Sequence, residues 1–267
     1  MLSARGLFQE IYDNDEAYRL FCSIAMNGES QGGWENARIA ALVDDPELAP
    51  KIVRHGADED KHGRIFRGLM RNRGLEPVEI PEETDYTMRL ERLGIGLAHS
   101  RLQEDEELTP HDIMVYLAHS RVTEQRASEQ MQLLCKIFAD NAQMGKAVKQ
   151  ISADEDRHLA YCHEELLRLA GQGHTAEINT TLDETAHAEI RVYRDVSIAV
   201  MKNMARILKW PKAKLAVLTL GINGVYGYER AGGWKRMVSL REPAIHNALG
   251  DGAVHGAPAG SAGSAGM

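Results

Sequence analysis

The sequence predicts an all-α protein built on a bundle of four long helices. Apolar residues recur at three- and four-residue spacing along most of the chain, whereas the two-residue alternation typical of strands is almost absent. The hexapeptide ADEDKH begins at residue 57 and returns as ADEDRH at residue 153, a shift of 96. The same shift aligns Asp44 with Asp140, each at an expected turn between two helices. Two copies of a helix pair make a four-helix bundle.

Signals at the helix ends divide the chain into elements. Asp45-Pro46 and Thr109-Pro110 each place an N-capping residue before a Pro at the first helical position. The segment 74–83 contains two Pro and is expected to be a connection. The expected helices cover 14–43, 46–73, 84–101, 110–140, 143–171 and 175–209, with a further helix after Pro211.

These elements form one expected helical domain over 1–242, with a core bundle at about 15–171 and additional helices at 84–101 and 175–240. Residues 243–267 are rich in Gly, Ala, Ser and Pro. Such a segment has too little apolar surface to offset the entropy lost on ordering. We therefore expect a disordered C-terminal tail.

The composition excludes several classes of function. A net charge of −8 argues against nucleic acid or an anionic membrane as the main partner. The three cysteines (Cys22, Cys135 and Cys162) form no CxxC pair, so neither a disulfide framework nor a thiolate metal site is expected. The first residues lack the apolar core of a secretory signal. The apolar segment 213–228 is shorter than the ~20 residues of a membrane span. We expect a cytoplasmic protein.

Carboxylates interrupt the apolar stripe of each of the four long helices. The stripe residues concerned are Glu29, Glu59, Glu124 and Glu155, and His62 and His158 follow two of them by three positions. The Glu-x-x-His spacing puts both side chains on one helix face. A buried unpaired carboxylate costs several kcal/mol, and four facing one another cost far more.

Two divalent cations would cancel the formal charge of −4 that four Glu and two neutral His carry. The stripes therefore predict a dinuclear metal centre held by Glu29, Glu59, His62, Glu124, Glu155 and His158. Glu35 is the alternative ligand from the first helix. It lies six residues beyond Glu29, about 9 Å along the axis, on a more polar stripe. We favour Glu29, and the choice stays open at this point.

The ligand pattern resembles that of the ferritin-like di-iron carboxylate superfamily over roughly residues 15–170. Residues 154–158 (DEDRH) and 58–62 (DEDKH) are similar to its D-E-x-R-H signature, with Lys61 at the Arg position of the second. Within the superfamily, Gly28-Glu29, Trp34-Glu35-Asn36 and His163-Glu164-Glu165-Leu166 weakly resemble motifs of aldehyde-deformylating oxygenase. The resemblance implies a ferritin-like four-helix bundle, here with additional helices and a disordered tail.

Further residues are expected around the centre. The resemblance implies that Asp58 and Asp154 hydrogen-bond to the ligand imidazoles and fix their orientation. Arg121, one turn before Glu124, is either a charge partner of the centre or a surface residue. Four small residues beside the ligands leave room for a substrate or for close helix packing: Gly32, Gly33, Ala127 and Ser128.

The resemblance implies an enzyme, an O2-activating di-iron oxidase or oxygenase that acts on a small, apolar organic substrate. Its cofactors would be two iron ions, although carboxylate and imidazole ligands also accept manganese. Electrons would come from a ferredoxin or reductase, since the sequence contains no flavin or nicotinamide motif. The alternatives are a non-enzymatic ferritin-like iron-binding or oxidative-stress protective protein, and a metal-free interaction module. A homodimer is also an open expectation.

Overall fold

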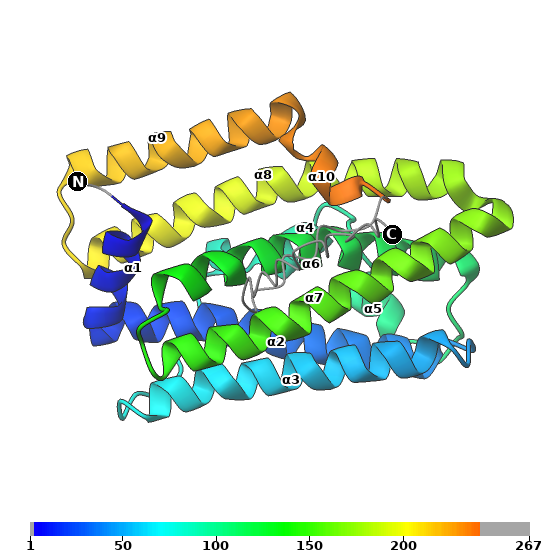
Figure 1. The fold of residues 1–267 in the computed structure, drawn as a ribbon, viewed down its shortest axis with the longest axis horizontal. Helices are drawn as coiled ribbons and strands as arrows, with labels where there is room; N and C mark the ends of the chain where they lie inside the picture. The colour runs from blue at the N-terminus through cyan, green and yellow to red at the C-terminus, as the bar shows by residue number, and fades with distance from the viewer. Residues whose placement is uncertain (1–2, 241–267) are drawn as a thin grey trace, which may run out of the picture.

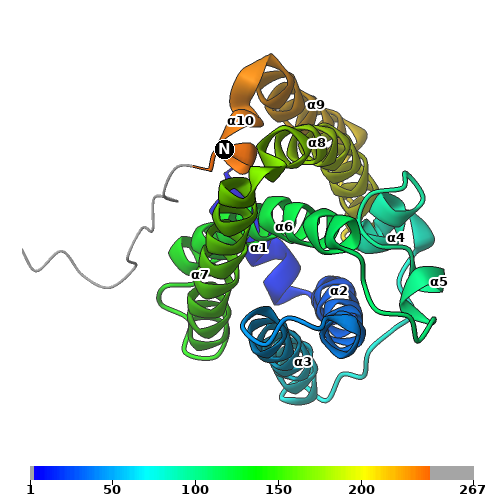
Figure 2. The ribbon, with the colours of Figure 1, turned by 90° about the vertical axis from the view of Figure 1, so that its right-hand side faces the viewer.

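The computed structural model describes residues 3–240, and within them it contains helices and connections but no strand. The all-α class is therefore confirmed. Four long helices run side by side (Figures 1 and 2). They are α2 (Asp15–Leu42), α3 (Leu48–Arg71), α6 (Pro110–Ile137) and α7 (Met144–Leu169). Such a bundle is compatible with a ferritin-like fold.

Each half of the bundle is a pair of consecutive helices, and capping residues in the sequence mark where helices begin. Thr109 and Asp112 form a capping box at the start of α6, with Pro110 at its first position. Asn14 caps α2 by accepting a hydrogen bond from the Ala17 amide. Asp45 accepts hydrogen bonds from the amides of Glu47 and Leu48, so α3 begins two residues after the expected start at Pro46.

The core of the bundle is layered along its length. One apolar cluster, which includes Ile39, Ile52, Leu117 and Cys162, fills one end. A second cluster, which includes Cys22, Phe66, Leu134 and Ile151, fills the other end. On each of α2, α3, α6 and α7 the candidate metal ligands lie between the residues of these two clusters. The two apolar layers therefore enclose one polar layer.

Close contact between α2 and α3 depends on glycine. A Cβ atom at Gly56 would lie 3.0 Å from the Cβ of Asn36 and 3.2 Å from the carbonyl oxygen of Gly33. A Cβ at Gly33 would lie 2.6 Å from the Oδ1 of Asp60. The two backbones thus approach more closely than any larger residue allows.

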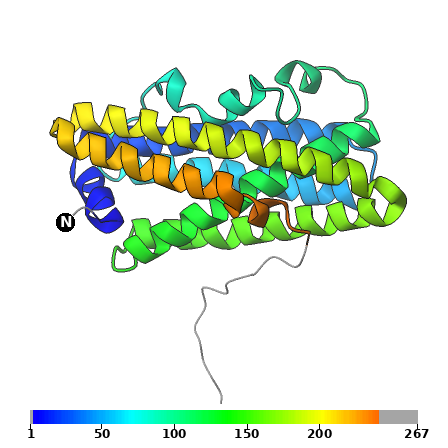
Figure 3. The same ribbon diagram turned by 90° about the horizontal axis from the view of Figure 1, so that it is seen from above.

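Additional helices cover one side of the bundle. After a π-helical turn (Ala170–His174), α8 (Thr175–Ile207) runs back along α6, and α9 (Lys212–Tyr228) lies on α8 (Figures 2 and 3). No residue of α9 is buried, and Val217, Leu220, Val225 and Tyr228 are all more than half exposed. The chain then returns to α6 through a second π-helical turn (Glu229–Gly233) and α10 (Lys235–Val238).

Among the shorter elements, one expectation is wrong and one helix was not expected. The single helix expected at 84–101 is instead a 3-10 turn (Glu82–Thr84) followed by α4 (Tyr86–Glu91) and α5 (His99–Leu102). The break occurs because Gly94 and Gly96 have φ angles of 72° and 82°, which no helix accepts. A helix that was not expected, α1 (Ala4–Asp13), precedes the bundle.

Among the described residues, no helix combines the length and the apolar character needed to cross a membrane. The disordered tail expected at 243–267 lies outside the described residues.

Replacing Gly56 by Ala should lower the free energy of unfolding by about 1–3 kcal/mol, because the added methyl group overpacks the α2–α3 contact. Gly68→Ala is the matched control on the same helix, since a Cβ at Gly68 meets no atom within 4 Å. The control should be neutral or stabilise the protein by up to about 1 kcal/mol. Urea unfolding measures both, and equal midpoints for the two variants would contradict the close packing.

Candidate metal centre

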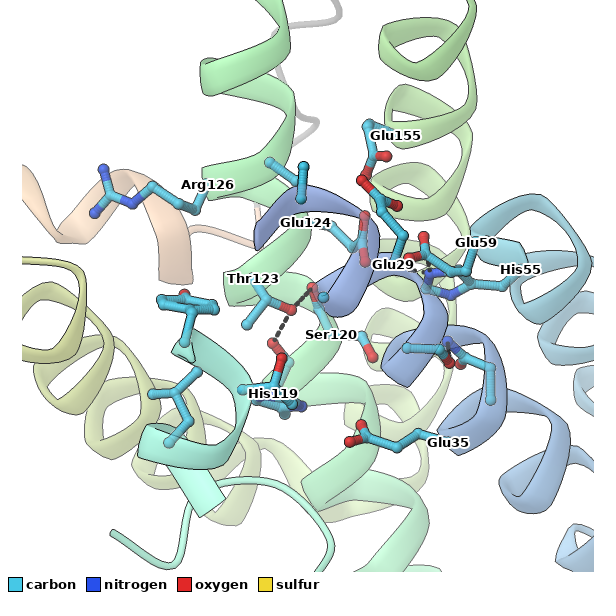
Figure 4. A pocket seen from close by; sticks show the side chains of 18 of the residues that line it. Glu29, Glu35, His55, Glu59, His119, Ser120, Thr123, Glu124, Arg126 and Glu155 are labelled. Carbon is cyan, nitrogen blue, oxygen red and sulfur yellow. Dashed lines mark hydrogen bonds and ion pairs between the residues drawn. The ribbon is translucent and has the colours of Figure 1, made fainter. Parts of the chain in front are cut away.

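The polar layer contains two overlapping groups of side chains, each able to hold a metal ion. The first group is His55, Glu59, Glu124 and His158, and the second is Glu29, Glu59, His62 and Glu155. Within each group, one ligand atom per residue lies within 4.8 Å of the others. Glu59 belongs to both groups, so its carboxylate is placed to bridge two ions. Figure 4 shows Glu29, His55, Glu59, Glu124 and Glu155 gathered from different helices.

The first group pairs two imidazoles with two carboxylates. The Nε2 atom of His55 lies 3.2 Å from Glu124 Oε1 and 3.4 Å from Glu59 Oε1. The Nδ1 atom of His158 lies 3.5 Å from Glu59 Oε1 and 3.6 Å from Glu124 Oε2. Within the described part of the chain, His158 Nδ1 and Glu124 Oε2 are buried without a hydrogen-bond partner. Buried polar atoms without a hydrogen-bond partner are consistent with a site in which a bound cation is the missing partner.

The second group places one imidazole among three carboxylates. The Nδ1 atom of His62 lies 3.1 Å from Glu29 Oε2, 3.4 Å from Glu155 Oε1 and 4.0 Å from Glu59 Oε1. The His62 side chain is fully buried. Its Nδ1 faces these carboxylates, whereas its Nε2 lies on the opposite side of the ring, against Asp154.

The first aspartate of each copy of the repeated motif faces the histidine of the other helix. The Oδ2 atom of Asp154 lies 2.9 Å from His62 Nε2, and that of Asp58 lies 3.6 Å from His158 Nε2. Lys61 lies between the two aspartates, 2.5 Å from Asp58 Oδ1 and 2.6 Å from Asp154 Oδ2. Lys61, which stands at the Arg position of the D-E-x-R-H pattern, thus links the two copies of the motif.

The charge state of Asp154 determines which nitrogen of His62 carries the proton. Burial alone would raise the pKa of Asp154, but hydrogen bonds from Lys61, His62 and Arg157 outweigh it and lower the pKa to about 2. A carboxylate only accepts hydrogen bonds, so His62 donates its Nε2–H to Asp154. The lone pair of Nδ1 is then directed at the second group, as a metal ligand requires.

A chain of hydrogen bonds orients His55 in the same way. Asn36 donates its amide nitrogen to the Gly32 carbonyl, so its Oδ1 accepts from the Tyr116 hydroxyl at 2.6 Å. Tyr116 must then accept from the Tyr161 hydroxyl, 2.7 Å away. Tyr161 in turn accepts from His55 Nδ1, also at 2.7 Å. The Nε2 lone pair of His55 is thereby left for the first group.

His55 is the residue that the sequence interpretation missed. The 96-residue repeat does not indicate it, because residue 55 corresponds to Ile151 in the second copy, which carries no ligand atom. The available signal was its position four residues before Glu59, on the same face of the helix.

The other expected site residues are distributed as follows. Glu35 lies outside both ligand groups, with its Oε1 atom 2.7 Å from His99 Nε2, whereas Glu29 belongs to the second group. Arg121 is buried and donates to Gln125 Oε1 and to the Ser239 carbonyl, each at 3.3 Å. Neither contact belongs to a ligand group, and metal binding by any of these residues stays a prediction.

Without metal, protons compensate part of the charge. Burial and the neighbouring Glu59 raise the pKa of Glu29 well above its usual range, and burial and Glu124 do the same to Glu155. Burial favours neutral His55, but Glu124 outweighs it and raises the pKa of His55 to about 9. Burial and the neighbouring His55 favour the neutral ring of His158, but the carboxylates of Glu124 and Glu155 outweigh them and raise its pKa to about 9.

A cavity of about 350 Å³ adjoins the centre. It lies between α2 and α6, with side chains of α4 and α8 on its other walls. Gly32 and Ala127 line it, and a Cβ at Gly32 would lie 3.0 Å from Glu59 Oε2. Gly33 and Ser128 lie at helix contacts instead, against Asp60 and Asp156 respectively. The first pair leaves room beside the ligands, and the second pair serves packing.

Comparison with protein-family models and with curated protein sequences finds no match to this chain. The function must therefore be inferred from the site itself.

Metal binding at pH 7 should release protons, because the pKa values of His55 and His158, raised to about 9, keep these rings protonated in the metal-free protein, and the raised pKa values of Glu29 and Glu155 act in the same direction. Calorimetric titration with Mn²⁺ in two buffers of different ionisation enthalpy measures the release. An apparent enthalpy that is independent of the buffer would contradict this charge assignment.

The same shifts predict how the stability of the metal-free protein depends on pH. A group with a raised folded-state pKa contributes stability below its ordinary pKa, 6.5 for His55 and His158, and loses it as the pH rises through about 9. The melting temperature of the metal-free protein should therefore fall between pH 7 and pH 10. With metal bound, the melting temperature should fall much less over the same range. A melting temperature of the metal-free protein that rises between pH 7 and pH 10 would contradict the prediction.

Asp154→Asn should weaken metal binding about 10–100-fold, because the amide no longer holds the Nε2–H of His62 as a carboxylate does. Asp140→Asn, which changes an exposed residue at the turn between α6 and α7, serves as the control. Competition with a fluorescent chelator measures the affinity. Equal affinities for the two variants would show that Asp154 does not orient the ligand.

Proposed function

We propose that this protein is a dinuclear-metal enzyme, a di-iron oxidase or oxygenase that uses O2 to oxidise a small organic substrate. The observation that supports it most is the pair of ligand groups that share Glu59 beside a cavity of about 350 Å³. A site built only for structure or storage needs no such space next to its ligands.

The ligand atoms suit iron or manganese. Imidazole nitrogens and carboxylate oxygens bind both metals, and no thiolate belongs to either group. Two divalent ions balance the four carboxylates of Glu29, Glu59, Glu124 and Glu155 once the histidines are neutral. Bound iron would supply one-electron and O2 chemistry, which side chains alone do not provide.

The chain itself contributes orientation and a dry environment. Asp154 and the Tyr161–Tyr116–Asn36 chain fix the ligand nitrogens of His62 and His55. The apolar clusters on either side of the polar layer exclude water along the bundle axis. The cavity gives a substrate access to the face of the centre formed by Glu29, Glu59 and Glu124. We further propose that electrons come from a separate ferredoxin or reductase.

O2 uptake by the iron-loaded full chain tests the proposal. Protein loaded anaerobically with Fe²⁺ and freed of excess iron should retain two irons per chain and consume O2 repeatedly while a reductant is supplied. Glu59→Gln should lose most of the iron and the uptake, because it removes the ligand shared by both groups. Glu184→Gln changes an exposed residue of α8 and should behave like the unaltered protein.

Three results would contradict the proposal, and the first is a chain that retains two irons but consumes no O2. A chain that accumulates many irons as a mineral would be an iron-binding or protective protein. A chain that retains less than one metal ion would be a metal-free helical module.

A further inference from the structure

One carboxylate on the cavity wall has no place in the metal centre. Glu35 lines the cavity, and its side chain is 16% exposed. Figure 4 shows it, together with His119, apart from the cluster formed by Glu29, Glu59 and Glu124. Along α2, six residues separate Glu35 from Glu29, which is about 9 Å. A ligand of that length can contact Glu35 and the centre together.

The immediate surroundings of Glu35 carry excess negative charge. Its Oε1 atom lies 2.7 Å from His99 Nε2, and His99 Nδ1 lies 3.5 Å from Glu91 Oε2. One imidazole thus faces two carboxylates and can compensate at most one of them. Burial raises the pKa of Glu35 although His99 opposes the shift. An additional hydrogen-bond donor or cation would stabilise this carboxylate.

No free cation lines the cavity among the described residues. The one Lys or Arg side chain on its wall is that of Arg126. Glu189 accepts two hydrogen bonds from the Arg126 guanidinium, at 2.7 and 2.8 Å, and Glu229 lies 3.3 Å from Arg126 Nη1. An anionic ligand would therefore enter an acidic cavity and find no unpaired positive charge, at a large desolvation cost.

His119 provides a second polar contact in the same cavity. Its Nε2 atom is buried, and within the described part of the chain it has no hydrogen-bond partner. Its Nδ1 atom faces Gly96, where a Cβ would approach within 3.1 Å. Burial lowers the pKa of His119 to about 4, so the ring is neutral at pH 7. A neutral ring with an unmatched buried nitrogen is suited to a polar ligand group rather than to an ion pair.

Apolar side chains make up most of the remaining wall near Glu35. They come from separate elements and include Ile39, Leu90, Leu97 and Leu102. The cavity thus combines an acidic, hydrogen-bond-accepting end with an apolar body and a metal centre.

We propose that Glu35 and His119 bind the polar head of the ligand, and that this head is a hydrogen-bond donor, preferably the ammonium group of an amine. The apolar walls take the carbon skeleton, and carboxylic or sulfonic acids are rejected. The inference that this ligand is the substrate rests on the proposed function. The inference that the cavity prefers an amine is independent of it.

Three probes of equal chain length test the proposal: hexylamine, hexan-1-ol and hexane-1-sulfonate. Calorimetric titration of the metal-loaded full chain at pH 7 under nitrogen should rank their affinities in that order, with the amine roughly tenfold tighter than the alcohol, as for a hydrogen bond to a charged group. Glu35→Gln should weaken hexylamine binding roughly tenfold and change the affinity for hexan-1-ol much less. Glu184→Gln, an equal charge change outside the cavity, should alter neither.

Sulfonate binding as tight as amine binding would overturn the proposal. So would an unchanged amine affinity in Glu35→Gln, or the absence of saturable hexylamine binding at millimolar concentration. The same titrations on metal-free protein separate this proposal from the proposed function. An amine preference that depends on Glu35, in a chain that takes up no O2, would retain the ligand site and reject the oxygenase. O2 uptake by a chain whose hexylamine affinity does not depend on Glu35 would reject the ligand site and retain the oxygenase.

Discussion

The structure depends on one constraint: seven ionisable side chains share a dry layer between two apolar clusters and must be neutralised there. Burial of uncompensated charge costs several kcal/mol per group. In the metal-free chain, raised pKa values favour the protonated forms of Glu29, Glu155, His55 and His158. Two cations would neutralise the same layer with the ligand atoms already in place, so metal binding and folding stability are linked.

The surrounding architecture follows from that layer. Lys61 joins Asp58 to Asp154, and each aspartate faces the histidine of the opposite helix, so α3 and α7 are coupled through the centre. Gly32 leaves space beside Glu59. The cavity lies on the α2–α6 side of the bundle, where α4 and α8 cover it. Contacts between α3 and α7 therefore orient the ligands, whereas the α2–α6 side of the bundle gives access to them.

The bundle and most of the ligand layer were predictable because helix periodicity is local information. A carboxylate in the middle of an apolar stripe, such as Glu124, is predicted from the local sequence to lie on the core-facing side of its helix. His55 was missed because the repeat that guided the search has no ligand at residue 151. The helix expected at 84–101 is interrupted at Gly94 and Gly96. Both adopt left-handed conformations, which depend on the connection that they form. The pairing of Glu35 with His99 joins residues 64 apart, and no local pattern records it.

Anomalous scattering at the iron absorption edge, from crystals of the iron-loaded full chain, tests the central claim most directly. Two peaks should lie in the polar layer, one among His55, Glu59, Glu124 and His158 and the other among Glu29, Glu59, His62 and Glu155. Both should be within bonding distance of the Glu59 carboxylate. Crystals of iron-loaded protein that show no peak in this layer, or only peaks at the protein surface, would contradict it.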